Sequence, residues 1–328
     1  MQITKQTTID ELALAPQEMI QSQIETIVLY HSFRRHGSAS SLPWLHDVEE
    51  VTANSQFSLL RQKFPHGARR STLSVSIDDG YRSVFEIGIP LLLDAGIPVT
   101  VNLTGSMLEG EGLWRDFVRV LMKNRLTSEF SALWRQRSGQ HLPDDPYSFY
   151  RATKTPKFYS ATLQDEIRAF TRLHCPEDFA LCLGLCAVPE NLVFHPLVTY
   201  GNHGYAHHVM SALSEAEQRK DIERNAKLLN KWIPANKLSP IFALPFGRGD
   251  DANHDTIDVL KNLGYGGIAY SRGRINLRQA RPGFCCVERW MAPTNLEKFT
   301  HDLGRLKINT YYRVAKDLVR GLSGRKTT

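Results

Sequence analysis

The sequence predicts an α/β fold in which parallel strands alternate with helices, arranged as a sheet or as a barrel. The first observation is a set of apolar segments that alternate with period two or run without interruption, as strands do. These segments are residues 26–31, 73–78, 98–105, 197–203, 239–247 and 264–271. The second observation is that helical patterns lie between most of them. Strands that alternate with helices are typical of a parallel sheet or an α/β barrel.

The clearest helical pattern covers residues 214–233. It opens with Ser214 and, three residues later, Glu217, which is the spacing of a capping box. One face of the segment carries apolar side chains, namely Ile222, Ala226, Leu229 and Ile233. We therefore expect a helix that packs one side on a core.

Residues 111–191 interrupt the alternation of strands and helices. They hold several helix-like segments and hardly any strand pattern, so we expect a helical insertion that forms a lid over the site. The chain as a whole divides into three parts, of which the second contains the insertion. These are an N-terminal extension over residues 1–24, an α/β domain over residues 25–304 and a basic tail over residues 305–328.

The composition is that of an ordinary soluble globular protein, with 42% apolar and 23% charged residues. No apolar run approaches the roughly 20 residues that cross a bilayer. The first 21 residues contain scattered acids and no apolar stretch behind a basic start, so they do not resemble a secretory signal. Five cysteines without a CxxC pair fit reduced thiols better than a disulfide framework. We therefore expect a cytoplasmic location.

The net charge of +6 comes from the tail. Residues 305–328 hold seven basic residues and one acidic residue, which leaves 33 basic and 33 acidic residues in the rest of the chain. A neutral body argues against a nucleic-acid groove. In a helix, the tail would have an apolar face of Tyr311, Val314, Ala315, Leu318 and Leu322 opposite Arg313, Lys316 and Arg320. We favour packing on the main domain; the alternative is weak contact with an anionic surface at the inner membrane face.

Polar residues stand where two of the strand patterns stop. Asp78 and Asp79 end one segment, and Gly80 follows. Neighbouring strand residues point in opposite directions, so the two carboxylates cannot easily do the same job. Two adjacent carboxylates also repel, which raises the pKa of one of them unless a cation intervenes. His203 and His207 follow another segment at a spacing that puts both rings on one side of a helical turn. One carboxylate with two imidazoles is a common catalytic zinc set, and the second carboxylate can then act as a base.

In this order the motifs resemble those of the polysaccharide deacetylases with a NodB-homology domain, also called carbohydrate esterase family 4. The resemblance extends over about residues 26–293. It depends on "SIDDG" at residues 76–80, "HGYAH" at residues 203–207 and "FALPFG" at residues 242–247. The stretches "LKNLGYGGIAYS" and "CVERWMAP" also resemble parts of this family. The implied fold is a distorted (β/α) barrel of the NodB type, interrupted by the helical insertion.

The resemblance implies a role for each matched residue. Asp78 would be the general base, and the N–H of Phe246 would stabilise the oxyanion. A divalent metal would be held by Asp79, His203 and His207. Zinc is the expected metal, although such ligands also accept iron, cobalt or nickel.

Three positions depart from the family pattern. Many members have an arginine that steadies the base where this chain has Phe242, so the partner of Asp78 is unassigned. Many have proline where this chain has His208. The late Leu-His-Asp motif that supplies a general acid is not evident, because His301 stands in a helical pattern. Some members instead carry the acid in a Tyr-His pair on an early strand, so we prefer His31 over His301.

The expected function is the metal-dependent removal of an N-acetyl group from an acetylated carbohydrate, giving acetate and a free amine. The alternatives are an O-acetyl esterase, a cyclic C–N hydrolase on the same metal site, and a glycan-binding homologue without catalysis. The last alternative is disfavoured because all four metal-site and base residues are present. The sequence leaves open which sugar is the substrate and what the oligomeric state is.

Overall fold

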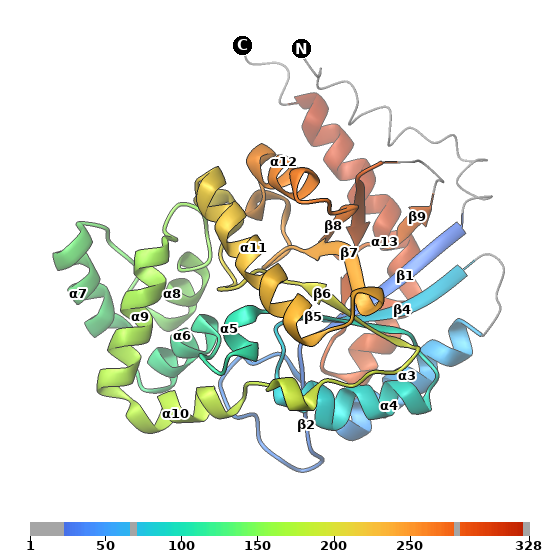
Figure 1. The fold of residues 1–328 in the computed structure, drawn as a ribbon, viewed down its shortest axis with the longest axis horizontal. Coiled ribbons are helices and arrows are strands. Elements are labelled where there is room, and N and C mark those ends of the chain that lie inside the picture. The colour runs from blue at the N-terminus through green and yellow to red at the C-terminus, as the bar shows by residue number, and fades with distance from the viewer. Residues whose placement is uncertain (1–22, 66–70, 279–282, 324–328) are drawn as a thin grey trace.

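The strands form a parallel barrel. The computed structural model describes residues 23–65, 71–278 and 283–323 (Figure 1). The main sheet has eight parallel strands in the order β10-β8-β7-β6-β5-β4-β1-β11. Their bounds are β1 (Gln23–Tyr30), β4 (Ser71–Ile77), β5 (Val99–Leu103), β6 (Val198–Asn202), β7 (Leu238–Ala243), β8 (Gly267–Tyr270), β10 (Cys285–Glu288) and β11 (Trp290–Met291). Additional strands are β9 (Asn276–Arg278), antiparallel to β1, and the separate pair β2 (Ser32–Arg34) and β3 (Asp47–Glu49).

A single residue closes the barrel. Strand β10 pairs with β8 at one end of the sheet, and β11 pairs with β1 at the other end. Only Arg289 separates these two strands, and its N–H donates to the carbonyl of Tyr270 at 3.0 Å. The N–H of Ala292 donates to the carbonyl of Leu29 at 2.9 Å. The chain thus joins the two edges of the sheet, and the predicted distorted (β/α) barrel is confirmed.

Helices surround the barrel. They are α3 (Glu50–Lys63), α4 (Ile89–Asp94), α11 (Glu215–Trp232), α12 (His254–Asn262) and α13 (Leu296–Ser323), with a π-helical turn at η1 (Val84–Gly88). The predicted capping box of α11 is present, since Ser214 Oγ accepts from the N–H of Glu217 and Glu217 accepts from the N–H of Ser214. Ile222 and Leu229 on its predicted apolar face are buried.

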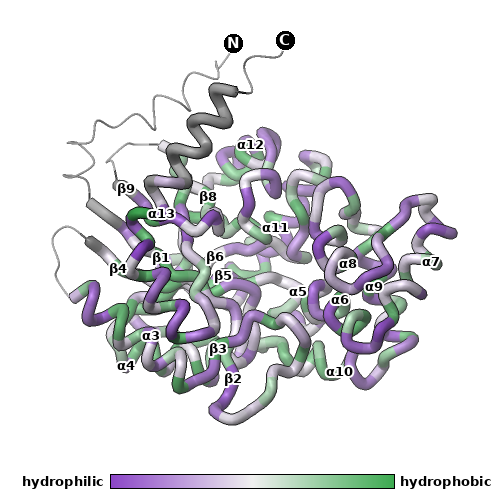
Figure 2. The backbone as a smooth tube through the Cα atoms, turned by 180° about the vertical axis from the view of Figure 1, so that it is seen from behind, coloured by the Kyte–Doolittle hydropathy of each residue, from purple (hydrophilic) through white to green (hydrophobic). Residues whose placement is uncertain are grey.

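Six helices lie between β5 and β6, beside the barrel on the left of Figure 1. They are α5 (Gly105–Leu108), α6 (Trp114–Lys123), α7 (Thr127–Ser138), α8 (Pro146–Ala152), α9 (Ala161–His174) and α10 (Pro176–Gly184). Phe130 packs edge-on against Phe149 and Phe170 in this part of the core. In Figure 2 hydrophilic and hydrophobic stretches succeed one another along helices such as α9, as expected for helices with one side buried.

Two elements extend across predicted boundaries. The first strand begins at Gln23, three residues before its predicted start at residue 26, and α13 passes without a break through the predicted boundary between residues 304 and 305. The physical reason is that Phe299, Leu303 and Leu306 form one buried stripe, so the tail extends the last helix of the barrel.

The amphipathic faces predicted for the tail cannot be placed. The side chains of Tyr311 and of residues 313–323 lie outside the described part of the chain, as do residues 1–22 of the N-terminal extension. Within the described ranges, no helix combines the length and the apolar character that crossing a membrane requires.

Candidate metal and catalytic site

The Asp78–Asp79 pair occupies a sharp turn at the end of β4. Both side chains are buried. Asp79 has a φ of +77° and Gly80 a φ of +103°, so two successive residues adopt left-handed backbone conformations. For Asp79 this costs roughly 1–2 kcal/mol. The neighbouring strands hold the turn, because the N–H of Asp78 donates to Tyr30 of β1 at 3.1 Å and the N–H of Thr104, after β5, donates to the carbonyl of Asp79 at 3.0 Å.

The two histidines lie in a loop after β6, so the predicted helical turn was wrong. Gly204 and His207 have φ values of +74° and +54°, which no right-handed helix contains. The carboxylate of Asp221, on α11, instead accepts hydrogen bonds from the N–H groups of Tyr205 and Ala206, both at 2.9 Å. This loop still brings the rings of His203 and His207 together, with centroids 4.9 Å apart.

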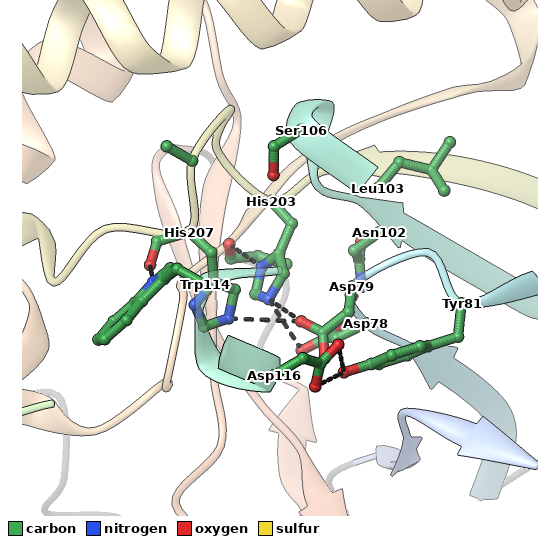
Figure 3. A network of polar contacts seen from close by, with 12 residues as sticks. Asp78, Asp79, Tyr81, Asn102, Leu103, Ser106, Trp114, Asp116, His203 and His207 are labelled. Carbon is green, nitrogen blue, oxygen red and sulfur yellow. Dashed lines mark hydrogen bonds and ion pairs between the residues drawn. The ribbon is translucent and has the colours of Figure 1, made fainter. Parts of the chain in front are cut away.

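Three buried side chains converge as a candidate metal centre (Figure 3). Asp79 Oδ1 lies 3.5 Å from His203 Nε2 and 3.4 Å from His207 Nε2, and the three donor atoms all lie within 4.8 Å of one another. Among the described residues, Asp79 Oδ1 has no hydrogen-bond donor. A buried carboxylate oxygen without a donor is costly, and a cation would satisfy it. The donor set therefore fits a divalent metal.

Neighbouring groups fix the ring of His203 and the backbone of His207 at the centre. His203 Nδ1 lies 2.8 Å from the carbonyl of Ala243, so this nitrogen carries a proton and Nε2 faces the centre, where it can act as a ligand once it is deprotonated. Trp114 Nε1, on α6, donates to the carbonyl of His207 at 2.9 Å. The helical insertion thus holds the backbone of one proposed ligand.

Arg289 is the partner of the predicted base, which the sequence left unassigned. Its Nη1 donates to Asp78 Oδ1 at 2.6 Å and to Ser76 Oγ at 3.0 Å, and Asn102 Nδ2 donates to the same Asp78 oxygen at 2.8 Å. Phe242, at the position where many family members have arginine, is buried instead. The signal in the sequence that could have identified this partner is an arginine between two short strand-like stretches in "CVERWMAP".

The charges around the site lower the pKa values of both aspartates. Burial alone would raise the pKa of Asp78, but Arg289 and then His203 outweigh it and lower the pKa. Burial would likewise raise the pKa of Asp79, but His203 and His207 lower it. Both carboxylates are therefore ionised near neutral pH. Burial lowers the pKa of His207 to about 3, so its ring is neutral and available as a ligand.

A cavity of about 230 Å³ contains the site. It collects the residues predicted for catalysis and metal binding, namely His31, Asp78, Asp79, His203, His207 and Phe246. His301 is not among the lining residues; it is exposed on α13, with Nδ1 3.1 Å from Asp302. His46 also lines the cavity, its ring 5.6 Å from that of His31, and no sequence motif marked it.

Phe246 occupies a strained turn after β7. Its φ is +62°, and its ring packs edge-on against His207 at a centroid distance of 4.6 Å. Within the described part of the chain, no acceptor takes the Phe246 N–H. An N–H group without a partner, in a turn that lines the same cavity as the candidate metal centre, suits the predicted contact with an oxyanion.

His208 replaces the proline of many family members and connects two parts of the fold. Its Nδ1 is hydrogen-bonded to the hydroxyl of Tyr159 in the insertion, and its Nε2 lies 3.5 Å from Asp221 on α11. The same Asp221 carboxylate holds the loop between the two metal-site histidines. His208 therefore connects the insertion to the loop that carries His203 and His207, the two candidate metal ligands.

Removing Arg289 is expected to destabilise the barrel at its seam. In metal-free protein, Arg289→Met leaves the buried Asp78 carboxylate without its closest cation, and the free energy of unfolding should fall by about 3–5 kcal/mol. Urea unfolding of the two single variants and of Asp78→Asn/Arg289→Met measures this. The double variant should recover part of the loss, and strictly additive losses would contradict the ion pair.

Comparisons with known proteins were consistent with the motifs. Residues 192–268 match the family model described as polysaccharide deacetylase. No curated protein matches the chain. Among solved structures, the deacetylase PplD of Streptococcus pyogenes is similar at 13% identity, covering 86% of this chain and 98% of that one with a TM-score of 0.47. IcaB of Ammonifex degensii is similar at 16% identity, 85% and 95% coverage and a TM-score of 0.46.

At these identities and TM-scores, the structural likeness says nothing of what this chain binds or cleaves. The family match includes β6, the loop with both histidines and the turn at Phe246. It supports a carbohydrate deacetylase in general terms. Together with the motif at Asp78 and Asp79, it confirms the predicted resemblance of this chain to the polysaccharide deacetylase family.

Proposed function

We propose that this protein is a metal-dependent hydrolase that removes an N-acetyl group from an acetylated sugar and releases acetate and a free amine. The observation that carries the proposal is a buried Asp79, His203 and His207 set beside a second, ion-paired carboxylate in one cavity. The match to polysaccharide deacetylases supports the same reaction class.

Asp79, His203 and His207 would hold the metal. When bound, a divalent ion such as zinc supplies Lewis-acid chemistry and makes water acidic enough to yield a nucleophile near neutral pH. One carboxylate and two imidazoles suit zinc and also accept iron, cobalt or nickel.

Asp78 is arranged to accept a proton from the attacking water. Its Oδ1 already receives hydrogen bonds from Asn102 and Arg289, so Oδ2, which lies 3.7 Å from His203 Nε2, is the oxygen left for water. Its lowered pKa keeps the carboxylate ionised at neutral pH. A positioned carboxylate of this kind is a general base.

Phe246 and His31 would stabilise the oxyanion and protonate the leaving amine, respectively. The Phe246 N–H would donate to the oxyanion that forms when water attacks the acetamide carbonyl. His31 would protonate the departing amine. Burial lowers the pKa of His31, against the opposing effect of Asp79 and Asp78, so the resting ring is neutral. The proton that Asp78 takes from water would pass to His31 and from there to the amine.

His31→Ala should lower acetate release by roughly 10²–10⁴-fold, the usual contribution of a positioned acid or base. His301→Ala should leave acetate release unchanged, because His301 is exposed on α13. Both variants should keep their metal. Loss of activity in His301→Ala with full activity in His31→Ala would reassign the acid.

The test of the proposed function is an acetate-release assay on protein loaded with zinc, iron, cobalt or nickel, and on protein treated with a chelator. The substrates are nucleotide-linked, lipid-linked and polymeric N-acetyl sugars. We expect acetate from at least one class, lost on chelation and restored by metal. No acetate from any class with any metal would contradict the proposal, and acetate release that survives chelation would contradict the metal dependence.

A further inference from the structure

One side of the cavity is lined by four basic side chains, which we call the cationic wall: Arg115, Arg119, Lys154 and Arg248. The first two lie on α6, Lys154 follows α8, and Arg248 follows the turn at Phe246. Three of the four therefore come from the helical insertion. None of them belongs to the metal centre or to the predicted base, acid and oxyanion contact.

Two of the four cations have no carboxylate partner among the described residues. Arg119 pairs with Asp116 at 2.7 Å, and Arg248 pairs with Asp251 at 2.9 Å. Arg115 donates only to neutral oxygens, at Thr153 and at the carbonyl of Tyr150.

Lys154 is half-buried, and no carboxylate within the described ranges lies in ion-pair range of its ammonium group. The wall therefore carries two uncompensated positive charges.

The excess positive charge lowers the pKa values of Lys154 and Tyr150. Burial and, after it, the charge of Arg115 lower the pKa of Lys154 to about 8. Burial would raise the pKa of Tyr150, but Arg119, Arg115 and Lys154 together lower it to about 8. A positive charge repelled by its neighbours in a partly desolvated site is stabilised by an anion.

The metal side of the cavity does not neutralise the wall. Asp78 is paired with Arg289, and Asp79 faces the two histidines and the proposed metal. Arg115 is fixed between aromatic rings, with its guanidinium carbon 4.7 Å from the centroid of Trp114 and 4.2 Å from that of Tyr150. These rings hold the charge in place but supply no counter-anion.

An aromatic rim stands next to the wall. Trp44 lines the cavity and is 48% exposed, although it is a large apolar side chain. Tyr147 and Tyr150 meet it edge-on, at centroid distances of 5.6 and 5.3 Å. Exposed flat rings at the mouth of a pocket suit the apolar face of a sugar. The rim and the wall therefore offer adjacent places for a sugar and an anion.

We infer that the cationic wall binds a phosphate or diphosphate attached to the acetylated sugar. Two uncompensated cations match a phosphate group, which carries up to two charges, better than a single carboxylate. The inference rests on the proposed function and names its substrate class. A nucleotide-linked and a lipid-linked sugar share this chemistry, whereas a neutral polymer lacks it.

The test compares Lys154→Gln with Lys157→Gln on metal-loaded protein. Lys157 is three residues away and exposed, and it does not line the cavity, so it is the matched control. The probes are UDP-N-acetylglucosamine, a polyprenyl-diphosphate N-acetylglucosamine in detergent and neutral tri-N-acetylchitotriose. Lys154→Gln should lower kcat/KM for the diphosphate probes roughly 10- to 100-fold, mainly through KM.

The neutral probe and the control variant should show no such loss, and Lys154→Arg should restore most of the activity. Turnover of both diphosphate probes would mean that the wall recognises the diphosphate that they share. Turnover of only one would show whether the substrate is nucleotide-linked or lipid-linked. Equal losses on charged and neutral probes, or a wild-type protein that prefers the neutral probe, would overturn the inference.

A binding measurement separates this inference from the proposed function. Calorimetric titration of UDP-N-acetylglucosamine into metal-loaded Asp78→Asn, with and without Lys154→Gln, reports the subsite without turnover. Binding that weakens at least tenfold with Lys154→Gln supports the wall even if wild-type protein releases no acetate. Binding that is unchanged by Lys154→Gln overturns the wall even if acetate is released.

Discussion

Asp78→Asn is expected to lower acetate release roughly 10²–10⁴-fold while metal content stays unchanged. The asparagine keeps the shape of the side chain but cannot take a proton from water. The proposed metal ligands Asp79, His203 and His207 are unchanged in this variant. Steady-state acetate release and elemental analysis on the same preparation measure both quantities.

The variant also removes the charge that faces Arg289, so its fold needs a control. Ser76 Oγ and the carbonyl of Tyr270 remain as acceptors for the guanidinium, at 3.0 and 3.3 Å. Asp78→Asn should therefore still unfold cooperatively. A folded, metal-loaded Asp78→Asn with wild-type activity would show that Asp78 is not the base.

His203→Ala should lose both metal and activity. It removes one of three ligands, the one whose Nε2 is oriented by the hydrogen bond at Ala243. We expect less than about one-tenth of an equivalent of metal after dialysis, because loss even of an outer partner of a metal ligand typically costs 10- to 100-fold in affinity. Elemental analysis is the measurement, and His301→Ala on the exposed face of α13 is the matched control.

Asp79→Ala and His207→Ala should behave in the same way as His203→Ala. The contrast with Asp78→Asn is the informative result, since one carboxylate is assigned to the metal and its neighbour to proton transfer. Stoichiometric metal in His203→Ala would contradict the ligand assignment.

The parts of the site that were predictable are those that local sequence specifies. Polar residues that follow an apolar strand pattern lie at the end of that strand, and parallel strands bring such ends together. The positions of Asp78, Asp79 and His203 follow from this rule. The conformation of the histidine loop does not, because it depends on Asp221, which joins the loop only after α11 has packed.

Other contacts could not be predicted from the sequence because they join distant parts of the chain. Arg289 is 211 positions from Asp78, and the strand-like stretches on either side of it do not specify which carboxylate it meets. They meet because β10 and β11 lie at opposite edges of the sheet and Arg289 closes the barrel between them. The cationic wall is similar: its residues become neighbours only when the helices of the insertion pack beside the cavity.

The most direct test of the central claim is to count both products of one reaction. Metal-loaded wild-type protein is incubated with the best N-acetyl sugar from the substrate screen, and acetate and new primary amine are measured in the same sample. We expect one equivalent of amine for each equivalent of acetate, and roughly 10²–10⁴-fold slower formation of both products by Asp78→Asn. Acetate without amine would mean that an ester is cleaved, and the absence of both products from every N-acetyl sugar would contradict the account.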